Sequence, residues 1–273
     1  MIVRDLPIGP IGPIGPIGPI GPIVAPVTPG APESPRIGLV VPATDQVSEA
    51  AFADMLAGHP VSVVASRVAF ENPVVMATLA RMVDDLSRAT ALLLPGGRID
   101  VVAFSCTSGT VAAGLDRVAR AIEAAKPGVP FTTPITAAVA AFRRLGVRRI
   151  AVLTPYVDEV NEAIHGFLTA SGLEVVEFGS FHLRTEPEIA GVPPEAIVAA
   201  GRSIAVPGAE ALFISCTGLQ GHAAIAALEA ATGRPVVTSN QAQVWEALSL
   251  LEYGRPLHGY GRLLDSLVPA RAA

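Results

Sequence analysis

The sequence predicts an α/β fold built from two similar halves. From Arg36 onward, short apolar runs alternate with alanine-rich stretches, which is typical of parallel strands joined by crossover helices. Three pairs of landmarks also recur in the same order, at separations of 113, 110 and 105 residues: Ile37 and Ile150, Cys106 and Cys216, Pro130 and Pro235. We therefore expect two pseudo-symmetric Rossmann-like halves, each a small doubly wound parallel sheet, with an active site in the cleft between them.

Six strands are expected, three in each half. They cover residues 36–42, 61–68 and 100–105 in the first half, and 148–155, 174–181 and 210–215 in the second. Each is a short, mostly apolar run bounded by turn-forming residues or by a helical stretch. In open parallel sheets, ligands bind beyond the carboxyl ends of the strands, so the residues that follow these runs are the candidate site residues.

The chain divides into four segments. Residues 1–35 contain a repeated Ile-Gly-Pro unit and are expected to form a disordered or polyproline-like tail, because so few triplets could not sustain a collagen helix. Residues 36–140 form the expected N-terminal half, residues 141–265 the C-terminal half, and residues 266–273 a short tail.

Composition excludes several classes of function. The 273 residues carry a net charge of -5, and no basic cluster exceeds two adjacent arginines, so nucleic acid is not an expected partner. The longest apolar runs are far shorter than the roughly 20 residues of a membrane span, and the start of the chain lacks the apolar core of a secretory signal. We expect no membrane partner and a cytoplasmic location. The only lysine, Lys126, lies in a Lys-Pro-Gly turn that does not suit Schiff-base chemistry.

The two cysteines occupy matching positions. Cys106 and Cys216 each stand in a Ser-Cys-Thr tripeptide directly after an apolar run. A single buried cysteine is usually a small core residue, but the duplicated context favours a function for the pair. A disulfide is disfavoured in a reducing cytoplasm, and the spacing of cysteines and histidines does not predict a metal site. If the halves face each other, the two thiols converge on one cleft.

Two opposed thiols can move a proton across a substrate. Each cysteine is expected at a helix N-terminus, which lowers a thiol's pKa and would make both cysteines fast to alkylate. The neighbouring amides, those of Thr107, Ser108, Thr217 and Gly218, could bind a substrate carboxylate. One thiolate could remove the proton next to that carboxylate while the opposite thiol protonates the other face; alternatively, one thiolate adds to an activated double bond or acyl carbon. Neither route requires a metal or an organic cofactor.

Other residues at strand ends are weaker candidates. Tyr156 follows the strand at 148–155 and could hydrogen-bond a substrate oxygen, although an ordinary loop tyrosine is a close alternative. Pro42 and Thr44 end the first strand at the equivalent place, and Asp45 could cap the helix that follows. His222 is expected at a solvated helix position, with a role near the site as the alternative.

The motifs resemble a known family. "GVRRIAVLTPYVDEVNEAI" and "GYGRLLD" are similar to arylmalonate decarboxylase, and "FSCTSGT", "LFISCTGLQ" and "GRPVVTSNQAQVW" resemble the ectoine-utilisation family EutA. Both belong with maleate cis-trans isomerase in the aspartate/glutamate/hydantoin racemase superfamily. The resemblance implies acid/base or nucleophile roles for Cys106 and Cys216. It also implies carboxylate binding by Thr107, Ser108, Tyr156 and Gly218, with Val41 and Pro42 lining the pocket.

The departures from the family patterns bear on the reaction. The decarboxylase pattern has glycine where this chain has Cys106, so the second cysteine favours racemisation or isomerisation. The isomerase carries asparagine after its first strand, whereas this chain reads Pro-Ala-Thr-Asp, which disfavours maleate as the substrate. The resemblance therefore implies a cofactor-independent racemase or isomerase acting on a small carboxylate, such as an ectoine-derived acetylated diamino acid.

The alternative functions are a maleate isomerase, an arylmalonate-type decarboxylase, and a non-catalytic protein that binds a small carboxylate. In every case the expected partner is a small-molecule carboxylate. The sequence is compatible with a homo-oligomer and does not specify one.

Overall fold

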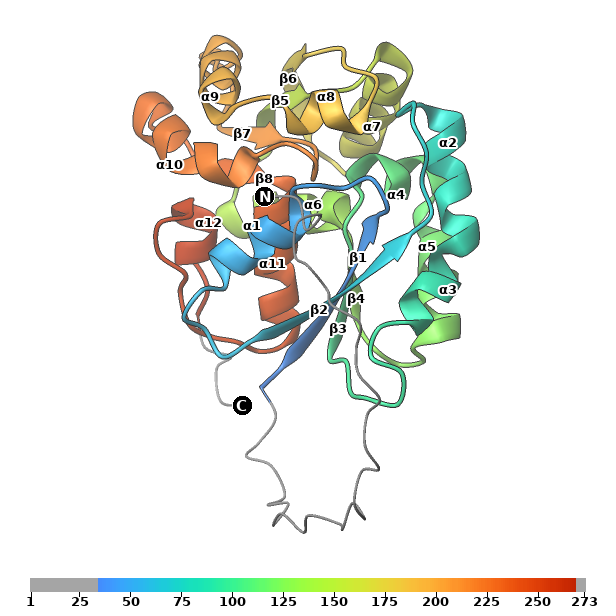
Figure 1. Cartoon of the computed structure of the whole chain (residues 1–273). Coiled ribbons are helices and arrows are strands. Elements are labelled where there is room, and N and C mark those ends of the chain that lie inside the picture. The colour runs from blue at the N-terminus through green and yellow to red at the C-terminus, as the bar shows by residue number, and fades with distance from the viewer. Residues whose placement is uncertain (1–33, 269–273) are drawn as a thin grey trace, which may run out of the picture. The chain divides into compact units, whose positions relative to one another are not determined.

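Two parallel four-stranded sheets form the core of the computed structural model, which describes residues 34–268 (Figure 1). The first sheet has the order β2-β1-β3-β4 and the second the order β6-β5-β7-β8. The strands are β1 (Arg36–Pro42), β2 (Ser62–Val68), β3 (Val101–Phe104), β4 (Phe131–Thr132), β5 (Arg149–Thr154), β6 (Glu174–Ser180), β7 (Ala211–Ile214) and β8 (Val236–Thr238). The shared strand order confirms the predicted α/β fold of two similar halves.

The strands β4 and β8 were not among the six expected. They follow the landmarks Pro130 and Pro235 and are only two and three residues long. Such short edge strands produce no recognisable apolar run, because tertiary pairing with β3 and β7 rather than local pattern defines them.

Helices connect and cover the strands. In the first half they are α1 (Ser48–Met55), α2 (Met76–Arg81), the 3₁₀ helix η2 (Met82–Asp85), α3 (Leu86–Ala91), α4 (Thr107–Ala113), α5 (Leu115–Ala125) and α6 (Pro134–Leu145). In the second half they are α7 (Asp158–Ala170), α8 (Glu186–Ala190), α9 (Pro194–Ser203), α10 (Gly221–Thr232), α11 (Ser239–Leu250) and α12 (Gly261–Asp265). Helices α2 to α5 flank one side of the first sheet, whereas α1 and α11 lie on the other (Figure 1).

The helix that follows the fourth strand of each half packs against the opposite sheet. Helix α6 contacts β8, helix α11 contacts β3 and β4, and the two helices pack on each other. Thr133 caps α6 and Thr238 caps α11, each accepting a hydrogen bond from the third amide of its helix. Gln243 of α11 donates through Nε2 to the Phe104 carbonyl at 3.0 Å. These contacts hold the carboxyl ends of the strands of both halves in one place.

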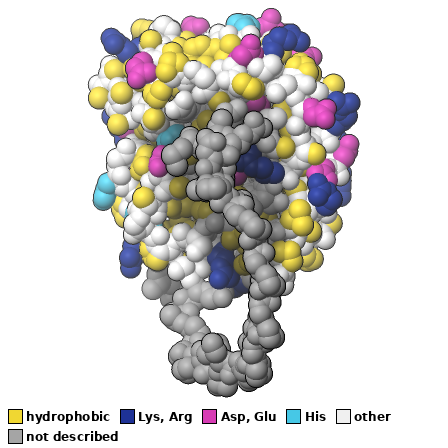
Figure 2. Space-filling view, viewed as in Figure 1, with side chains coloured by type: hydrophobic (Ala, Val, Ile, Leu, Met, Phe, Trp, Pro, Cys, Tyr) yellow, Lys and Arg dark blue, Asp and Glu magenta, His cyan; other side chains and the backbone are white. Residues whose placement is uncertain are grey.

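The expected boundary between residues 140 and 141 lies within α6. The Ile-Gly-Pro tail lies outside the described residues, as do residues 269–273 of the expected C-terminal tail. Basic and acidic side chains are interspersed over the visible face of the molecule (Figure 2). Among the described helices, each is too short or too polar to cross a membrane.

Candidate active site

The two Ser-Cys-Thr turns meet at the carboxyl ends of β3 and β7. Thr217 donates through Oγ1 to the carbonyl of Ser105, the residue before Cys106, at 3.2 Å. Thr107 donates through Oγ1 to Ser239 Oγ of the second half at 2.9 Å. The tripeptides of the two halves are therefore in direct contact, and both threonine hydroxyls are engaged in holding the halves together.

The two thiols are coupled electrostatically to each other and to Ser108 and Tyr156. Cys106 and Cys216 are free cysteines, with only 6% and 5% of their surface exposed. Ser108 lies close enough to Cys106 and to Tyr156 to influence the pKa of both groups, and the Tyr156 phenol lies close enough to Cys216 to lower the pKa of that thiol. Four sequence-predicted residues thus form one connected group that spans the two halves, from Cys106 through Ser108 and Tyr156 to Cys216.

Backbone amides complete the surroundings of both sulfur atoms. The amide of Gly109 donates to Cys106 Sγ at 3.2 Å, and the amide of Gly218 donates to Cys216 Sγ at 3.2 Å. Gly218, expected to bind the substrate, thus already donates to the thiol. The backbone of Tyr156 is fixed separately, since Asn161 Nδ2 and Ser180 Oγ both donate to its carbonyl, at 2.8 Å and 2.6 Å.

The expected lowering of the thiol pKa values is wrong. Burial, followed by the negative charge of Glu186, raises the pKa of Cys106 to about 12. The same two causes raise the pKa of Cys216 further, against the opposing hydrogen bonds from Tyr156 and Gly218. Loss of hydration outweighs the stabilisation that a few hydrogen bonds give to a buried thiolate.

The short or absent helix after each cysteine is one reason why the thiol pKa values are not lowered as expected. Cys106 is the N-cap of α4, as expected, but α4 has only seven residues. Cys216 does not open a helix, because a turn intervenes and α10 begins at Gly221. His222 accordingly lies in the first turn of α10, 3.6 Å from Asp54 (Nε2 to Oδ2), and does not belong to the thiol group.

Glu186 is a site residue that the sequence interpretation missed. It is the first residue of α8, only 9% exposed, and its amide donates to Asn72 Oδ1 of the first half at 2.9 Å. A Cβ placed on Gly218 would lie 2.8 Å from Glu186 Oε2 and 3.6 Å from Cys216 Sγ, so the carboxyl group lies beside the Cys216 turn. Burial, and then the charge of Asp45, raises the pKa of Glu186 to about 7.

A local signal could have located Glu186. Thr185 and Glu188 form a capping box, which marks a helix start shortly after the strand β6. A helix that starts just beyond a parallel strand begins at the carboxyl edge of the sheet, where sites form.

The loop after β1 lies at the same edge. Asp45 accepts hydrogen bonds from the amides of Val47 and Ser48 and from the Ser48 hydroxyl, so it satisfies donors at the start of α1, although Val47 and not Asp45 is the N-cap residue. Its charge also contributes to raising the pKa of Cys106 and of Glu186. Val41 and Pro42 are buried, and the Thr44 hydroxyl is buried without a hydrogen-bond partner among the described residues. These three predicted residues lie in the same loop as Asp45, whose charge influences Cys106, and they are not part of the group formed by the thiols, Ser108 and Tyr156.

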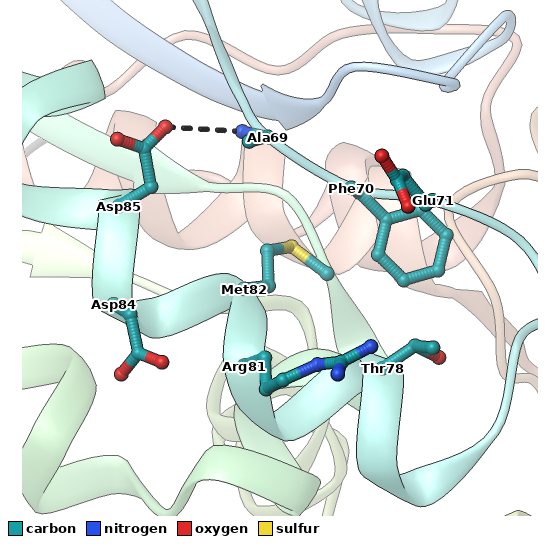
Figure 3. Close-up of a pocket in the computed structure, with 8 residues that line it drawn as sticks. All are labelled: Ala69, Phe70, Glu71, Thr78, Arg81, Met82, Asp84 and Asp85. Carbon is teal, nitrogen blue, oxygen red and sulfur yellow. Dashed lines mark hydrogen bonds between the residues drawn. The ribbon is translucent and has the colours of Figure 1, made fainter.

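A cavity of about 460 Å³ lies next to this site but does not include the thiols. Its lining residues are Ala69, Phe70, Glu71, Thr78, Arg81, Met82, Asp84 and Asp85 (Figure 3). Met82 reaches toward α4, because a Cβ on Gly109 would lie 3.1 Å from Met82 Cε and 2.7 Å from Cys106 Sγ. Gly109 thus lies between Met82 in the cavity wall and the Cys106 thiol. Within residues 34–268, no group of three or more histidine, cysteine, aspartate or glutamate side chains could hold a metal ion.

The comparisons with known proteins name the family of this chain. The model of the arylmalonate decarboxylase family matches residues 37–264, so the chain belongs to that family. The arylmalonate decarboxylase of Bordetella bronchiseptica is 37% identical over 143 residues, covering 50% of this chain and 59% of that protein. The maleate isomerase of Pseudomonas putida is 26% identical over 244 residues, covering 84% of this chain and 97% of that protein.

Solved structures of maleate isomerase and arylmalonate decarboxylase are also similar to this chain. A maleate isomerase variant from Pseudomonas putida S16, crystallised with maleate, superposes with a TM-score of 0.78 at 25% identity, covering 85% of this chain and 97% of that one. A double mutant of arylmalonate decarboxylase in its liganded form superposes with a TM-score of 0.75 at 31% identity, covering 85% and 99%.

Proposed function

We propose that this chain is a cofactor-independent racemase or isomerase that acts on a small carboxylate through acid/base chemistry at Cys106 and Cys216. The observation that carries the proposal is the connected group in which Ser108 and Tyr156 link the two buried thiols. A decarboxylase that works on one face needs a single proton donor, whereas two thiols can serve two faces of one carbon.

The two thiols act as a pair in opposite protonation states. Cys106, whose pKa is the less elevated, enters as the thiolate and removes the proton next to the substrate carboxylate. Cys216 enters as the thiol and protonates the opposite face of the resulting enolate, which inverts the carbon. In the reverse direction the roles exchange. The Tyr156 phenol donates toward Cys216 sulfur and stabilises the thiolate that forms there.

The remaining predicted residues hold the substrate in this proposal. The amides of Thr107 and Ser108 are the available donors for the carboxylate, because the Thr107 hydroxyl is engaged by Ser239 and Gly218 donates to Cys216. Val41, Pro42 and Thr44 form the wall beside Asp45. The orphaned Thr44 hydroxyl supports this placement, since a buried hydroxyl is normally hydrogen-bonded.

A second candidate is cis-trans isomerisation of the kind named for the maleate isomerases. It is favoured by alignments that cover 97% and 98% of relatives from Pseudomonas putida and Nocardia farcinica. In that chemistry one thiolate would add to an activated double bond, and the same pair of cysteines would serve. The ectoine-derived acetylated diamino acid stays the more specific substrate prediction for racemisation.

Proton exchange in deuterated water tests the proposal. The purified protein is incubated with a panel of small carboxylates, including amino acids, their acetylated forms, maleate and arylmalonates, and each sample is followed by NMR and chiral chromatography. Racemisation replaces the α-proton with deuterium without loss of carbon dioxide. Isomerisation instead interconverts the olefinic signals, decarboxylation releases carbon dioxide, and a binding protein leaves every ligand unchanged. The double variant Cys106→Ser/Cys216→Ser controls for contaminating activity.

A further inference from the structure

We propose that the substrate of this site carries an ammonium group in addition to its carboxylate, and that Glu186 binds that ammonium. This inference rests on the proposed function, since it assumes that the thiol group is where the substrate binds. It makes Glu186 the residue that selects the class of substrate.

The first support is the isolation of the Glu186 carboxyl group. The residue is nine-tenths buried, yet among the described residues its side chain makes no hydrogen bond or ion pair. Buried carboxylates in folded proteins are normally paired or hydrogen-bonded, because desolvating an unpaired charge is costly. An unpartnered carboxyl group beside Cys216 therefore indicates a missing partner, and the ligand can supply it.

The second support is the position of this group. Its Oε2 atom lies where any side chain at position 218 would collide with it, at 2.8 Å from an added Cβ. Gly218 thus leaves the space that the carboxyl group occupies next to the thiol. The α8 segment is also anchored to the first half, because Asn72 accepts from the Glu186 amide and Arg184 O accepts from the Val74 amide at 2.7 Å. The carboxyl group is consequently held between the halves, as the thiols are.

The third support is the absence of a protein cation to pair with Glu186. The charge that influences the pKa of Glu186 is that of another carboxylate, Asp45. Arg67 approaches Asp45 but donates to backbone carbonyls and to Glu49 Oε1 at 2.7 Å, near the surface. Arg184 is exposed and influences Glu188. With two carboxyl groups and no described basic side chain paired with Glu186, the site has a negative charge that a cationic ligand would balance.

The ammonium group fits better than the alternatives. A metal ion would need more ligands than Glu186 and an Asp45 already engaged by Ser48, and the described residues offer no such cluster. A second carboxylate on the substrate would be repelled by Glu186 and Asp45. A primary ammonium brings three donors and a positive charge, which matches an isolated carboxylate acceptor.

Binding of a cation would also prepare the thiols. The negative charge of Glu186 is the second-largest cause that raises the pKa of both cysteines. An ammonium paired with Glu186 cancels much of that charge and makes thiolate formation easier at the moment when substrate is bound. The resting protein would then keep protonated, unreactive thiols until the correct ligand arrives.

Matched ligands and matched variants test the inference. Binding of 2,4-diaminobutanoate, 2-aminobutanoate, 2-hydroxybutanoate and succinate is measured by calorimetry on the full chain, together with α-proton exchange in deuterated water. Glu186→Gln removes the charge and keeps the shape, and Glu195→Gln makes the same change at an exposed position of α9. For the wild type we expect the ammonium-bearing acids to bind at least about tenfold more tightly than the hydroxy acid and succinate.

Glu186→Gln should lose that preference, whereas Glu195→Gln should keep it. The inference is overturned if the wild type prefers the hydroxy acid or succinate, if no ammonium-bearing acid binds, or if Glu186→Gln retains the wild-type preference. Failure of the proposed function has a different signature. Ammonium-selective binding without any proton exchange would rule out the proposed enzyme activity and leave the role of Glu186 in place. Proton exchange confined to 2-hydroxybutanoate or succinate would support an enzyme activity and overturn the role of Glu186.

Discussion

The two halves share one sheet order and one tripeptide, yet they give their cysteines different surroundings. Cys106 is followed at once by α4 and is contacted by Gly109 and Ser108. Cys216 is followed by a turn and is contacted by Tyr156 and Gly218, with Glu186 beside it. The strands therefore repeat, whereas the loops that follow them differ. The duplicated scaffold positions two thiols, and the unequal loops make Cys106 the easier one to deprotonate.

Replacing each cysteine in turn should have the largest effect on activity and tests whether the two thiols have different roles. We expect Cys106→Ser and Cys216→Ser each to lower the rate of racemisation about a thousandfold, because general acid–base catalysis contributes factors of roughly 10² to 10⁴. Each variant should still exchange the α-proton of one enantiomer only, and the two variants should act on opposite enantiomers. Chiral chromatography and NMR of each enantiomer measure this. Full activity in either variant would remove that cysteine from the mechanism.

The charge of Glu186 should affect the stability of the folded protein as well as ligand binding. Its pKa of about 7 in the folded protein exceeds the ordinary value of 4.5, so the folded state binds more protons than the unfolded state between these values. Stability is then present at low pH and is lost as the pH rises from about 4.5 to about 7. Glutamine does not ionise, so Glu186→Gln should stabilise the protein at pH 8 by about 3 kcal/mol and have little effect at pH 4.

Urea unfolding of the wild type and Glu186→Gln at both pH values measures this difference. Glu195→Gln, which removes an exposed charge, is the control measured under the same conditions. Equal stabilisation at pH 4 and pH 8 would mean that shape, rather than charge, separates glutamine from glutamate here.

Alkylation rates measure the difference in pKa and reactivity between the Cys106 and Cys216 thiols. At pH 8 the raised pKa leaves little thiolate, although the higher intrinsic reactivity of a basic thiolate compensates in part. We expect iodoacetamide to label both cysteines several tens of times more slowly than a free thiol, as a rough figure from these two effects, with Cys106 ahead of Cys216. Mass spectrometry of timed samples from pH 7 to pH 10 should show rates that keep rising. A plateau near pH 8.5 would contradict the raised pKa values. Slow labelling of the ligand-free protein therefore does not identify a mere binding protein.

Tyr156→Phe tests the asymmetry of the two sites with the smallest change. Loss of the phenol removes a hydrogen bond to the Cys216 thiolate, which is worth roughly 1.5 to 3 kcal/mol. We expect kcat to fall about tenfold or somewhat more, and labelling of Cys216 to slow while labelling of Cys106 changes little. Tyr260→Phe, outside the thiol group, is the control. Equal slowing at both cysteines would show that Tyr156 supports the site as a whole instead of Cys216 in particular.

Local sequence patterns were enough to predict the fold class, the repeat, the six longer strands to within one or two residues, and the pairing of Cys106 with Cys216. They also located Ser108 and Tyr156, because residues that follow parallel strands must gather at one edge of the sheet. Three features required the folded chain: Glu186 joins these residues from α8, β4 and β8 complete the sheets, and burial raises the pKa of both thiols. Periodicity and capping are local properties that a sequence displays directly. Desolvation and charge proximity depend on residues distant in the chain, so they become readable only once the chain is folded.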